Sequence, residues 1–386
     1  MVLKIGRGSD IPPFRVMDVI AAANAHAAKR GPHDPRVIRM EVGQPALGAP
    51  FQAVEAAMAA LHRGHALGYT EAFGLISLRH RISRHYQDWY GTQVDPARIA
   101  VTTGASGAFP LAFLSAFDPG DSVALAAPYY PPYVNILTAL GMKPVILETG
   151  PETRFQPTVA MLETLDPRPA GLILASPCNP AGTMLHRDEL SAIAQWCDAN
   201  GVRLVSDEIY HGLHYDSPIA TATAFSPSAI VINSFSKYFS MTGWRVGWMV
   251  LPEDLCRPVE RLAQNMFISA PHIAQLTAEA AFDCGPELDA RRDGYQRSRD
   301  LLMEALPRAG FTRLSAAEGA FYLYADISDR GEASPAFCNR MLQELSIAAT
   351  PGVDFDARHG ERFVRFSYCG GEAEVAEAAE RLLRWS

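Results

Sequence analysis

The sequence predicts an α/β protein in which a mainly parallel sheet is sandwiched by helices, followed by a small α+β domain. Between residues 99 and 250, short apolar strands alternate with helical segments, which is typical of a parallel sheet covered on both faces. The chain has 386 residues. This is more than a single hydrophobic core usually accommodates, so we expect two domains.

The predicted elements begin with three helices, over residues 12–30, 50–63 and 74–90, where apolar residues recur at helical spacing. Gly31 and Pro32 close the first helix. Seven short apolar runs then predict strands, at residues 99–101, 122–125, 144–147, 171–174, 202–205, 229–232 and 246–250. Further helices are predicted among them at residues 108–117, 131–140 and 187–199. Residues 104–107 are predicted to form a turn.

The last third of the chain has a different pattern. Residues 253–305 are predicted to be mostly helical, and strands at 320–324 and 363–367 belong to a small unit closed by a helix over 372–385. We place the large domain at residues 45–284. The small domain comprises residues 1–44 and 285–386, because we expect the N-terminal helix to return and pack on the C-terminal unit.

The composition argues against several classes of function. The net charge is −8 and the basic residues form no long run, which argues against nucleic acid or an anionic membrane as the main partner. No apolar run has the length of a signal peptide or a membrane span. The six cysteines are far apart without a CxxC pair, so we expect reduced thiols in a cytoplasmic protein. His211 and His214 have no evident third ligand, and no metal site is predicted.

Lys237 is the most informative residue. Of the 34 Lys and Arg residues only four are lysines, and Lys237 follows the apolar run 229–232 inside a Ser-rich loop, with Arg245 further along. A desolvated lysine amine can form an imine, whereas arginine cannot. A lone lysine beside hydroxyls and an arginine therefore suits a Schiff-base nucleophile for a phosphorylated aldehyde. The alternative is a solvated loop lysine.

Unusual polar residues follow four of the predicted strands: the turn at 104–107, Asn179, Asp207 and the loop at 234–237. In an open α/β sheet, ligands bind in the crevice at the carboxyl ends of the strands. We therefore expect these four groups to converge on one site.

Each group has a chemical role and a simpler alternative. The turn at 104–107 opens a helix, whose free N–H groups suit a phosphate, although a plain helix start gives the same pattern. Asp207 at the end of an apolar strand needs a cationic partner such as a protonated pyridine nitrogen, unless it caps a helix. Asn179 and Tyr210 can hydrogen-bond a ring oxygen; the alternatives are a turn former before Pro180 and a packed aromatic ring.

Seven motifs together resemble the fold-type I pyridoxal-phosphate aminotransferases of class I/II. They run in the family's order from about residue 43 to 367, namely YTEAFG, TTGASGA, PYYPPY, SPCNPAGT, SDEIY, SFSKYFSMTGWRVGW and FVRFSY. The resemblance implies the fold of the PLP-dependent transferases. It also implies an enzyme that moves an amino group from an L-amino acid to a 2-oxo acid by a ping-pong mechanism.

The resemblance also implies a role for each site residue. Lys237 is the Schiff-base lysine and proton shuttle, Asp207 pairs with the pyridinium nitrogen, and Tyr130 stacks on the ring. Asn179 and Tyr210 hold the phenolate oxygen. The phosphate contacts are expected from the amides of Ala105 and Ser106 with Ser234, Ser236 and Arg245. Tyr69 is expected to reach the cofactor of the neighbouring subunit in a homodimer, and Arg365 binds the substrate α-carboxylate with Asn179 and the Gly43 backbone.

The substrate side chain is less well defined. Residues 265–271 contain no arginine, although relatives specialised for dicarboxylates in one branch carry one there. Arg15 is either a reader of an acidic side chain or, as we favour, part of a structural salt bridge. The same cofactor shell also serves C–S β-lyases, and a non-catalytic PLP-binding regulator is a rival of another class.

Overall fold

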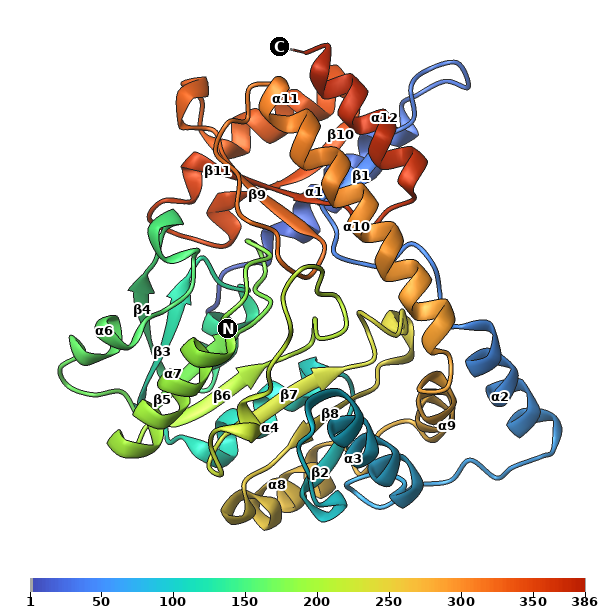
Figure 1. Cartoon of the computed structure of the whole chain (residues 1–386), viewed down its shortest axis with the longest axis vertical. Helices are drawn as coiled ribbons and strands as arrows, with labels where there is room; N and C mark the ends of the chain where they lie inside the picture. Colours follow the sequence, from blue (N-terminus) through green and yellow to red (C-terminus); the bar gives the residue numbers. More distant parts are fainter. Residues whose placement is uncertain (1–2, 386) are drawn as a thin grey trace.

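The computed structural model describes residues 3–385 and has the predicted α/β fold. Figure 1 shows a larger lower part built around one sheet and a smaller upper part built around another. The sheets have seven and four strands, respectively. Among the described residues, none of the helices is long and apolar enough to cross a membrane.

The seven-stranded sheet forms the centre of the lower part. Its strand order is β2-β8-β7-β6-β5-β3-β4, and β8 is antiparallel to both of its neighbours, whereas the other pairs are parallel. The carboxyl ends of β2, β5, β6 and β7 therefore lie at the same edge. The strands are β2 (Ile99–Thr102), β3 (Ser122–Ala127), β4 (Lys143–Glu148), β5 (Gly171–Ala175), β6 (Arg203–Asp207), β7 (Ile230–Ser234) and β8 (Gly247–Val250).

Helices cover both faces of this sheet, because its strands are apolar on both sides. Side chains of α3, α7 and α9 belong to one hydrophobic cluster, and those of α4, α5 and α8 to another. Neighbouring strand residues alternate between the two clusters, such as Leu172 in the first and Ile173 in the second. The helices of this part are α2 (Phe51–His62), α3 (Ile76–Tyr90), α4 (Ala105–Ala116), α5 (Pro132–Ala139), α6 (Val159–Glu163), α7 (Arg187–Asn200), α8 (Glu253–Met266) and α9 (His272–Ala281).

The four-stranded sheet joins the two ends of the chain. Its order is β1-β10-β11-β9, and β1 pairs in parallel with β10 although more than 300 residues separate them. The first helix, α1 (Arg15–Ala28), also packs against β10. The strands are β1 (Ile38–Met40), β9 (Tyr322–Asp326), β10 (Ile347–Pro351) and β11 (Phe363–Ser367), and the other helices are α10 (Gly285–Arg308), α11 (Ser334–Leu345) and α12 (Glu372–Leu383). The exact division into two domains stays a prediction.

The structure corrects some of the predicted boundaries. Helix α1 begins at Arg15 rather than residue 12, because the carboxylate of Asp354 accepts the N–H groups of Arg15 and Val16 at 3.0 and 3.2 Å. The predicted turn at 104–107 is mostly helix, because Gly104 at φ 71° forms the N-cap and α4 starts at Ala105. The strands β1 and β10 and the helices α6 and α11 were not predicted.

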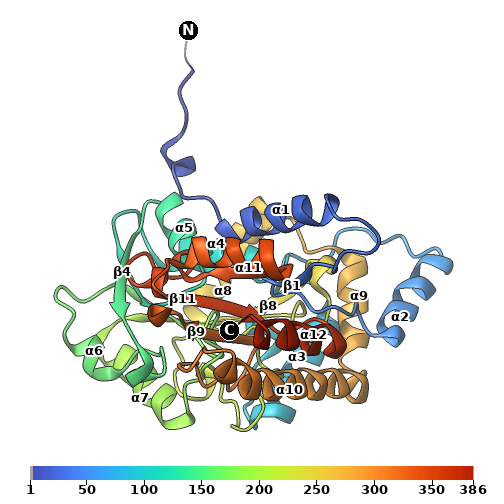
Figure 2. The same cartoon turned by 90° about the horizontal axis from the view of Figure 1, so that it is seen from above.

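The start of the chain stands away from the body of the molecule. In Figure 2 the described segment before α1 extends from the rest of the protein, while α1 itself lies along one side of the small sheet, next to α11. Helix α2 lies at the side of the molecule in both views. Helix α2 buries Ala53, Ala57 and Ala60 and packs against α9, whereas its other face is exposed.

Candidate active site

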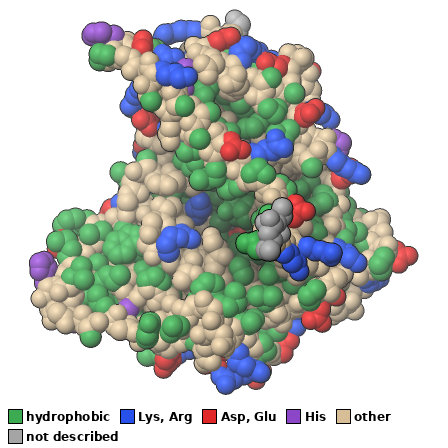
Figure 3. Space-filling view, turned by 180° about the vertical axis from the view of Figure 1, so that it is seen from behind, with side chains coloured by type: hydrophobic (Ala, Val, Ile, Leu, Met, Phe, Trp, Pro, Cys, Tyr) green, Lys and Arg blue, Asp and Glu red, His purple; other side chains and the backbone are tan. Residues whose placement is uncertain are grey.

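A cavity of about 270 Å³ lies where β2, β5, β6 and β7 end. The space-filling view shows a hollow between the upper and lower parts of the molecule, with Lys or Arg side chains at its mouth (Figure 3). All but one of the predicted site residues line the cavity. These are Gly43, Ala105, Ser106, Tyr130, Asn179, Asp207, Tyr210, Ser234, Ser236, Lys237, Arg245 and Arg365.

Asp207 is the last residue of β6 and is only 3% exposed. Its carboxylate accepts hydrogen bonds from the Tyr133 hydroxyl and, at 3.1 Å, from the N–H of Ile209. Burial raises the pKa of Asp207 to about 6 in spite of these donors and of the nearby Lys237 charge. A carboxylate in such a place is stabilised by a further cationic partner.

The Lys237 amine donates to the carbonyl oxygen of Gly43 at 2.7 Å. Burial lowers the pKa of Lys237 to about 8, with the positive charges of Arg365 and Arg245 acting in the same direction. A lowered pKa increases the fraction of neutral amine, the form that attacks a carbonyl group and removes a proton.

The start of α4 forms a cradle for an anion. The first N–H groups of a helix have no acceptor within the helix, and the Arg245 guanidinium lies beside them, with Nη2 3.5 Å from the Ser106 hydroxyl. A Cβ atom on Gly104 would lie 2.6 Å from this Nη2 atom, so a side chain there would fill the cradle. Ser234 and Ser236 add two hydroxyls, which lie 2.9 Å apart. This donor set suits a phosphate group.

Arg365 enters the cavity from β11 of the small sheet and is 2% exposed. Its Nη1 donates to Asn179 Oδ1 at 2.7 Å, and its Nη2 donates to the hydroxyl of Thr350 and the carbonyl of Glu41. Its guanidinium carbon lies 4.4 Å from the ring centre of Tyr322. Among the described residues its Nε has no hydrogen-bond partner although it is buried. Such a donor suits a carboxylate ligand.

Two tyrosines that were not predicted complete the polar part of the site. Tyr133 holds Asp207, as described above, and Tyr322 pairs its hydroxyl with that of Tyr210 at 2.8 Å. Tyr322 also excludes any side chain at Gly43, where a Cβ would lie 1.7 Å from its hydroxyl oxygen. Tyr133 belongs to the PYYPPY motif, so the sequence carried a signal for it, whereas nothing around Tyr322 distinguished it from a core residue.

One side of the cavity is apolar and was also not predicted residue by residue. We call it the wall, and it consists of four side chains at the start of the chain, Phe14, Val16, Met17 and Ile20. We call the residues at the strand ends the floor; these are Ala105, Ser106, Asp207, Ser234, Ser236 and Lys237. Floor and wall face the same cavity.

Two residues lie outside the cavity. Tyr69 is 82% exposed and does not line it. Arg15 lines a different cavity, between α1 and α11, and its guanidinium forms no ion pair with any residue between 3 and 385. A close salt bridge of the kind that we favoured for Arg15 is not formed within the described part of the chain, but the Arg15 charge acts to lower the pKa of Asp354, which burial raises.

The floor fits pyridoxal phosphate in three respects. The buried carboxylate of Asp207 lacks a full cationic partner, the Lys237 amine has a lowered pKa, and the cradle at Gly104 is kept open by the absence of a side chain. These match a pyridinium nitrogen, an aldehyde and a phosphate.

Comparisons with known proteins agree with this chemistry. The sequence model of the family "Aminotransferase class I and II" matches residues 35–382. A valine--pyruvate aminotransferase of Mycobacterium tuberculosis is 46% identical over 391 aligned residues, which cover 100% of this chain and 99% of the relative.

Solved structures give the same result. The crystal structure of an aminotransferase from Mycobacterium tuberculosis superposes with a TM-score of 0.96 at 45% identity, covering 100% of this chain and 99% of the other. That of a putative aminotransferase from Silicibacter pomeroyi gives 0.92 at 49% identity, covering 99% of each chain. The chain therefore belongs to the class I and II aminotransferases, pyridoxal-phosphate enzymes that transfer the amino group of an amino acid to a 2-oxo acid.

Proposed function

We propose that the preferred amino donor is a small apolar L-amino acid such as valine, and that pyruvate serves as acceptor. The observation that carries this proposal is the apolar wall contributed by α1, which leaves the substrate side chain in contact with Phe14, Val16, Met17 and Ile20. The relative named valine--pyruvate aminotransferase supports the same substrates.

The charges around the cavity support a neutral side chain. Among the lining residues only four are charged: Asp207, Lys237, Arg245 and Arg365. We assign the first three to the cofactor and Arg365 to the α-carboxylate of the substrate. Among residues 3–385, none that lines the cavity supplies a further cation for a second carboxylate, and a buried unpaired charge is costly. The same reasoning disfavours aspartate and glutamate as donors.

The residues have the following proposed roles. Pyridoxal phosphate, when bound, supplies an aldehyde that condenses with amines and a protonated ring that accepts electrons from the Cα–H bond. Lys237 holds the cofactor and, once released, carries the proton from Cα. Asp207 keeps the ring nitrogen protonated, and Asn179 and Tyr210 hold the ring oxygen. Arg365 and the Gly43 backbone orient the substrate carboxylate.

A donor screen tests the substrate assignment. With pyruvate as acceptor, we expect kcat/KM for L-valine to exceed that for L-aspartate by at least about tenfold, since an unpaired carboxylate loses more than 1.4 kcal/mol in an apolar site. L-alanine, with fewer methyl groups to bury, is the matched neutral control. A preference for aspartate over valine would contradict the assignment.

We also propose a homodimer in which Tyr69 reaches the cofactor phosphate of the partner subunit. Large apolar side chains are exposed on and near α2, including Phe51, Met58 and Leu61, and Tyr69 follows them in the chain. Exposed apolar patches of this kind mark interfaces. All six cysteines are free thiols, which supports the reducing environment of the cytoplasm.

Subunit mixing tests the position of Tyr69. Tyr69→Ala and Lys237→Ala proteins are each expected to be inactive or nearly so. When they are mixed and allowed to exchange, up to about a quarter of the wild-type activity should return, because half of the dimers are mixed and each has one intact site. A lack of recovery, with exchange verified by a mass tag, would place Tyr69 outside the partner's site.

A further inference from the structure

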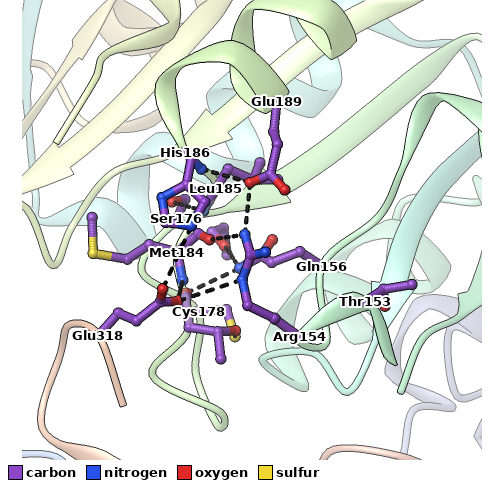
Figure 4. Close-up of polar contacts among 12 residues, drawn as sticks. Thr153, Arg154, Gln156, Ser176, Cys178, Met184, Leu185, His186, Glu189 and Glu318 are labelled. Atoms are coloured by element: carbon purple, nitrogen blue, oxygen red, sulfur yellow. Dashed lines mark hydrogen bonds and ion pairs between the residues drawn. The ribbon is translucent and has the colours of Figure 1, made fainter. Parts of the chain in front are cut away.

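The segment that carries Asn179 is held from outside the cavity by a buried glutamine. Figure 4 shows Gln156 among the polar contacts that surround Ser176, Cys178, Met184 and Leu185. Gln156 is 3% exposed and does not line the active-site cavity. It lies in the connection between β4 and α6, a segment without any motif that indicates function.

The Gln156 amide connects the two ends of this segment. Its Nε2 donates to the carbonyl of Ala175 at 3.2 Å and to the carbonyl of Thr183 at 3.0 Å. A side-chain amide nitrogen has two N–H donors, and both are used here. Two carbonyl acceptors also fix which end of the amide is the nitrogen. Gln156 therefore closes residues 176–182 into a loop of fixed span.

Arg154 and Phe155, which precede Gln156, hold the Gln156 side chain against the loop. Arg154 and Phe155 both have left-handed backbone angles, with φ at 54° and 57°, a conformation that is unfavourable for residues with a side chain. The Phe155 ring packs with Cys178 and Ala181 of the same loop. Arg154 forms an ion pair with Glu189 of α7 at 2.7 Å. These contacts offset the unfavourable backbone.

The closed loop determines the position of Asn179. Inside the loop, the N–H of Cys178 donates to the carbonyl of Thr183 at 3.0 Å, so this carbonyl serves both Gln156 and the loop backbone. Gln156 and Asn179 also line the same small cavity of about 20 Å³, together with Tyr133. Asn179 Oδ1 in turn accepts the hydrogen bond from Arg365. A change at Gln156 can therefore reach Arg365 through the loop and Asn179.

We propose that Gln156 is a positioning residue for Asn179, and through it for the substrate carboxylate and the cofactor ring. This inference rests on the proposed roles of Asn179 and Arg365. Gln156 does not line the cavity that holds substrate and cofactor. Its two hydrogen bonds fix the distance between the two ends of the loop, and this distance determines where Asn179 lies. Other contacts also hold the chain around the loop: the Glu318 carboxylate accepts the Met184 N–H at 2.9 Å, and His211 Nε2 lies 3.0 Å from the Ser176 carbonyl oxygen.

Gln156→Met is the decisive variant, because methionine has a similar length and no donor. We expect KM for L-valine to rise about tenfold with kcat within about threefold, and the dissociation constant of pyridoxal phosphate to rise severalfold. Thr277→Val is the matched control. It removes a buried hydrogen bond in α9, from the Thr277 hydroxyl to Ile273 at 2.8 Å, and should lower only the melting temperature.

A double-mutant cycle with Asn179→Ala separates positioning from general stability. If Gln156 acts through Asn179, then adding Gln156→Met to Asn179→Ala should change kcat/KM and cofactor affinity less than about twofold. Equal losses in both backgrounds would overturn the proposal, and so would a Gln156→Met protein that differs from wild type only in melting temperature. If Gln156→Met does not fold, Gln156→Asn, which keeps both donors on a shorter side chain, takes its place in the cycle.

The experiments distinguish a failure of the proposed function from a failure of the inference about Gln156. If wild-type protein shows no pyridoxal-phosphate binding or no transamination of L-valine, or if Asn179→Ala alone has no effect, the assigned roles are wrong whatever Gln156 does. If wild type and Asn179→Ala behave as expected and the cycle is additive, only the inference about Gln156 is wrong.

Discussion

The floor and the wall of the cavity are built in different ways. The floor residues lie at or just after the carboxyl ends of strands of the seven-stranded sheet, and Asp207 and Lys237 form hydrogen bonds with other parts of the protein. The wall belongs to α1, in which only Val16 and Ala23 are buried. A rigid floor suits chemistry that needs fixed geometry, whereas a lightly packed wall suits selection of a side chain. We therefore expect floor variants to change the reaction and wall variants to change the substrate.

The largest effect is expected at Lys237. Lys237→Ala removes both the attachment of the cofactor and the amine that moves the proton. Proton transfer alone contributes about 10²–10⁴-fold, so turnover should fall by at least this factor, while pyridoxal phosphate still binds through the cradle. Steady-state rates and equilibrium dialysis of the cofactor measure the two effects. Turnover close to wild type without an added amine would remove Lys237 from the reaction.

Arg365→Lys should have the next largest effect. A lysine keeps the charge but cannot hold a carboxylate with two parallel hydrogen bonds. We expect KM for every amino donor to rise about ten- to a hundredfold, or 1.4–2.8 kcal/mol, with cofactor affinity within about threefold. Kinetics on L-valine and L-alanine check this. A loss for one donor alone would indicate that Arg365 contacts the side chain instead.

Asp207, a floor residue, should make the free energy of unfolding depend on pH. Its pKa of about 6 in the folded protein lies above the ordinary value of 3.8, so the folded state binds the proton more tightly than the unfolded state. Ionisation therefore lowers the stability of the cofactor-free protein as pH rises from about 4 to about 6, and the whole loss is present above that range. Asp207→Asn has no such loss.

The prediction is a difference between two pH values. We compare the free energy of unfolding of cofactor-free Asp207→Asn with that of wild type by denaturant unfolding. The difference, variant minus wild type, should be about 2 kcal/mol larger at pH 7.5 than at pH 4.5. With pyridoxal phosphate bound, wild type should be more stable than Asp207→Asn at pH 7.5, since the ring cation then pairs with the carboxylate. An equal difference at both pH values would show that Asp207 is not strained in the cofactor-free protein.

Arg15 should matter least. Its side chain lines a cavity other than the active-site cavity and has no close ion pair within residues 3–385, although its charge acts to lower the pKa of Asp354. Arg15→Ala should therefore change kcat/KM for L-valine and L-aspartate less than about twofold. A selective loss for aspartate would reassign Arg15 to an acidic-substrate pocket.

The floor was predictable from the sequence because each of its residues follows an apolar strand inside a short motif. Once β6 and β7 are recognised, the parallel arrangement brings Asp207 and Lys237 to one edge, where Asn179 after β5 also lies. The resemblance to a known family then added the role of Arg365. These assignments remain predictions about function, although the residues do line one cavity.

The wall and its supports were not predictable in the same way. The carboxylate of Asp354 caps α1 across more than 300 residues, and β1 has only three residues with no pattern of its own. Gln156 lies in a loop whose backbone angles depend on packing by Phe155. Such contacts depend on how distant segments meet, and local spacing carries no information about them.

The central claim is that the wall selects the substrate while the floor performs the chemistry. The most direct measurement is a single-turnover reaction of pyridoxal-phosphate-loaded wild type and Ile20→Arg with L-valine and with L-aspartate, following loss of the cofactor's visible absorbance. Wild type should prefer valine by at least about tenfold. Ile20→Arg should reduce or reverse this preference with cofactor affinity unchanged within about twofold. An unchanged preference, or one that changes only together with cofactor affinity, would contradict the account.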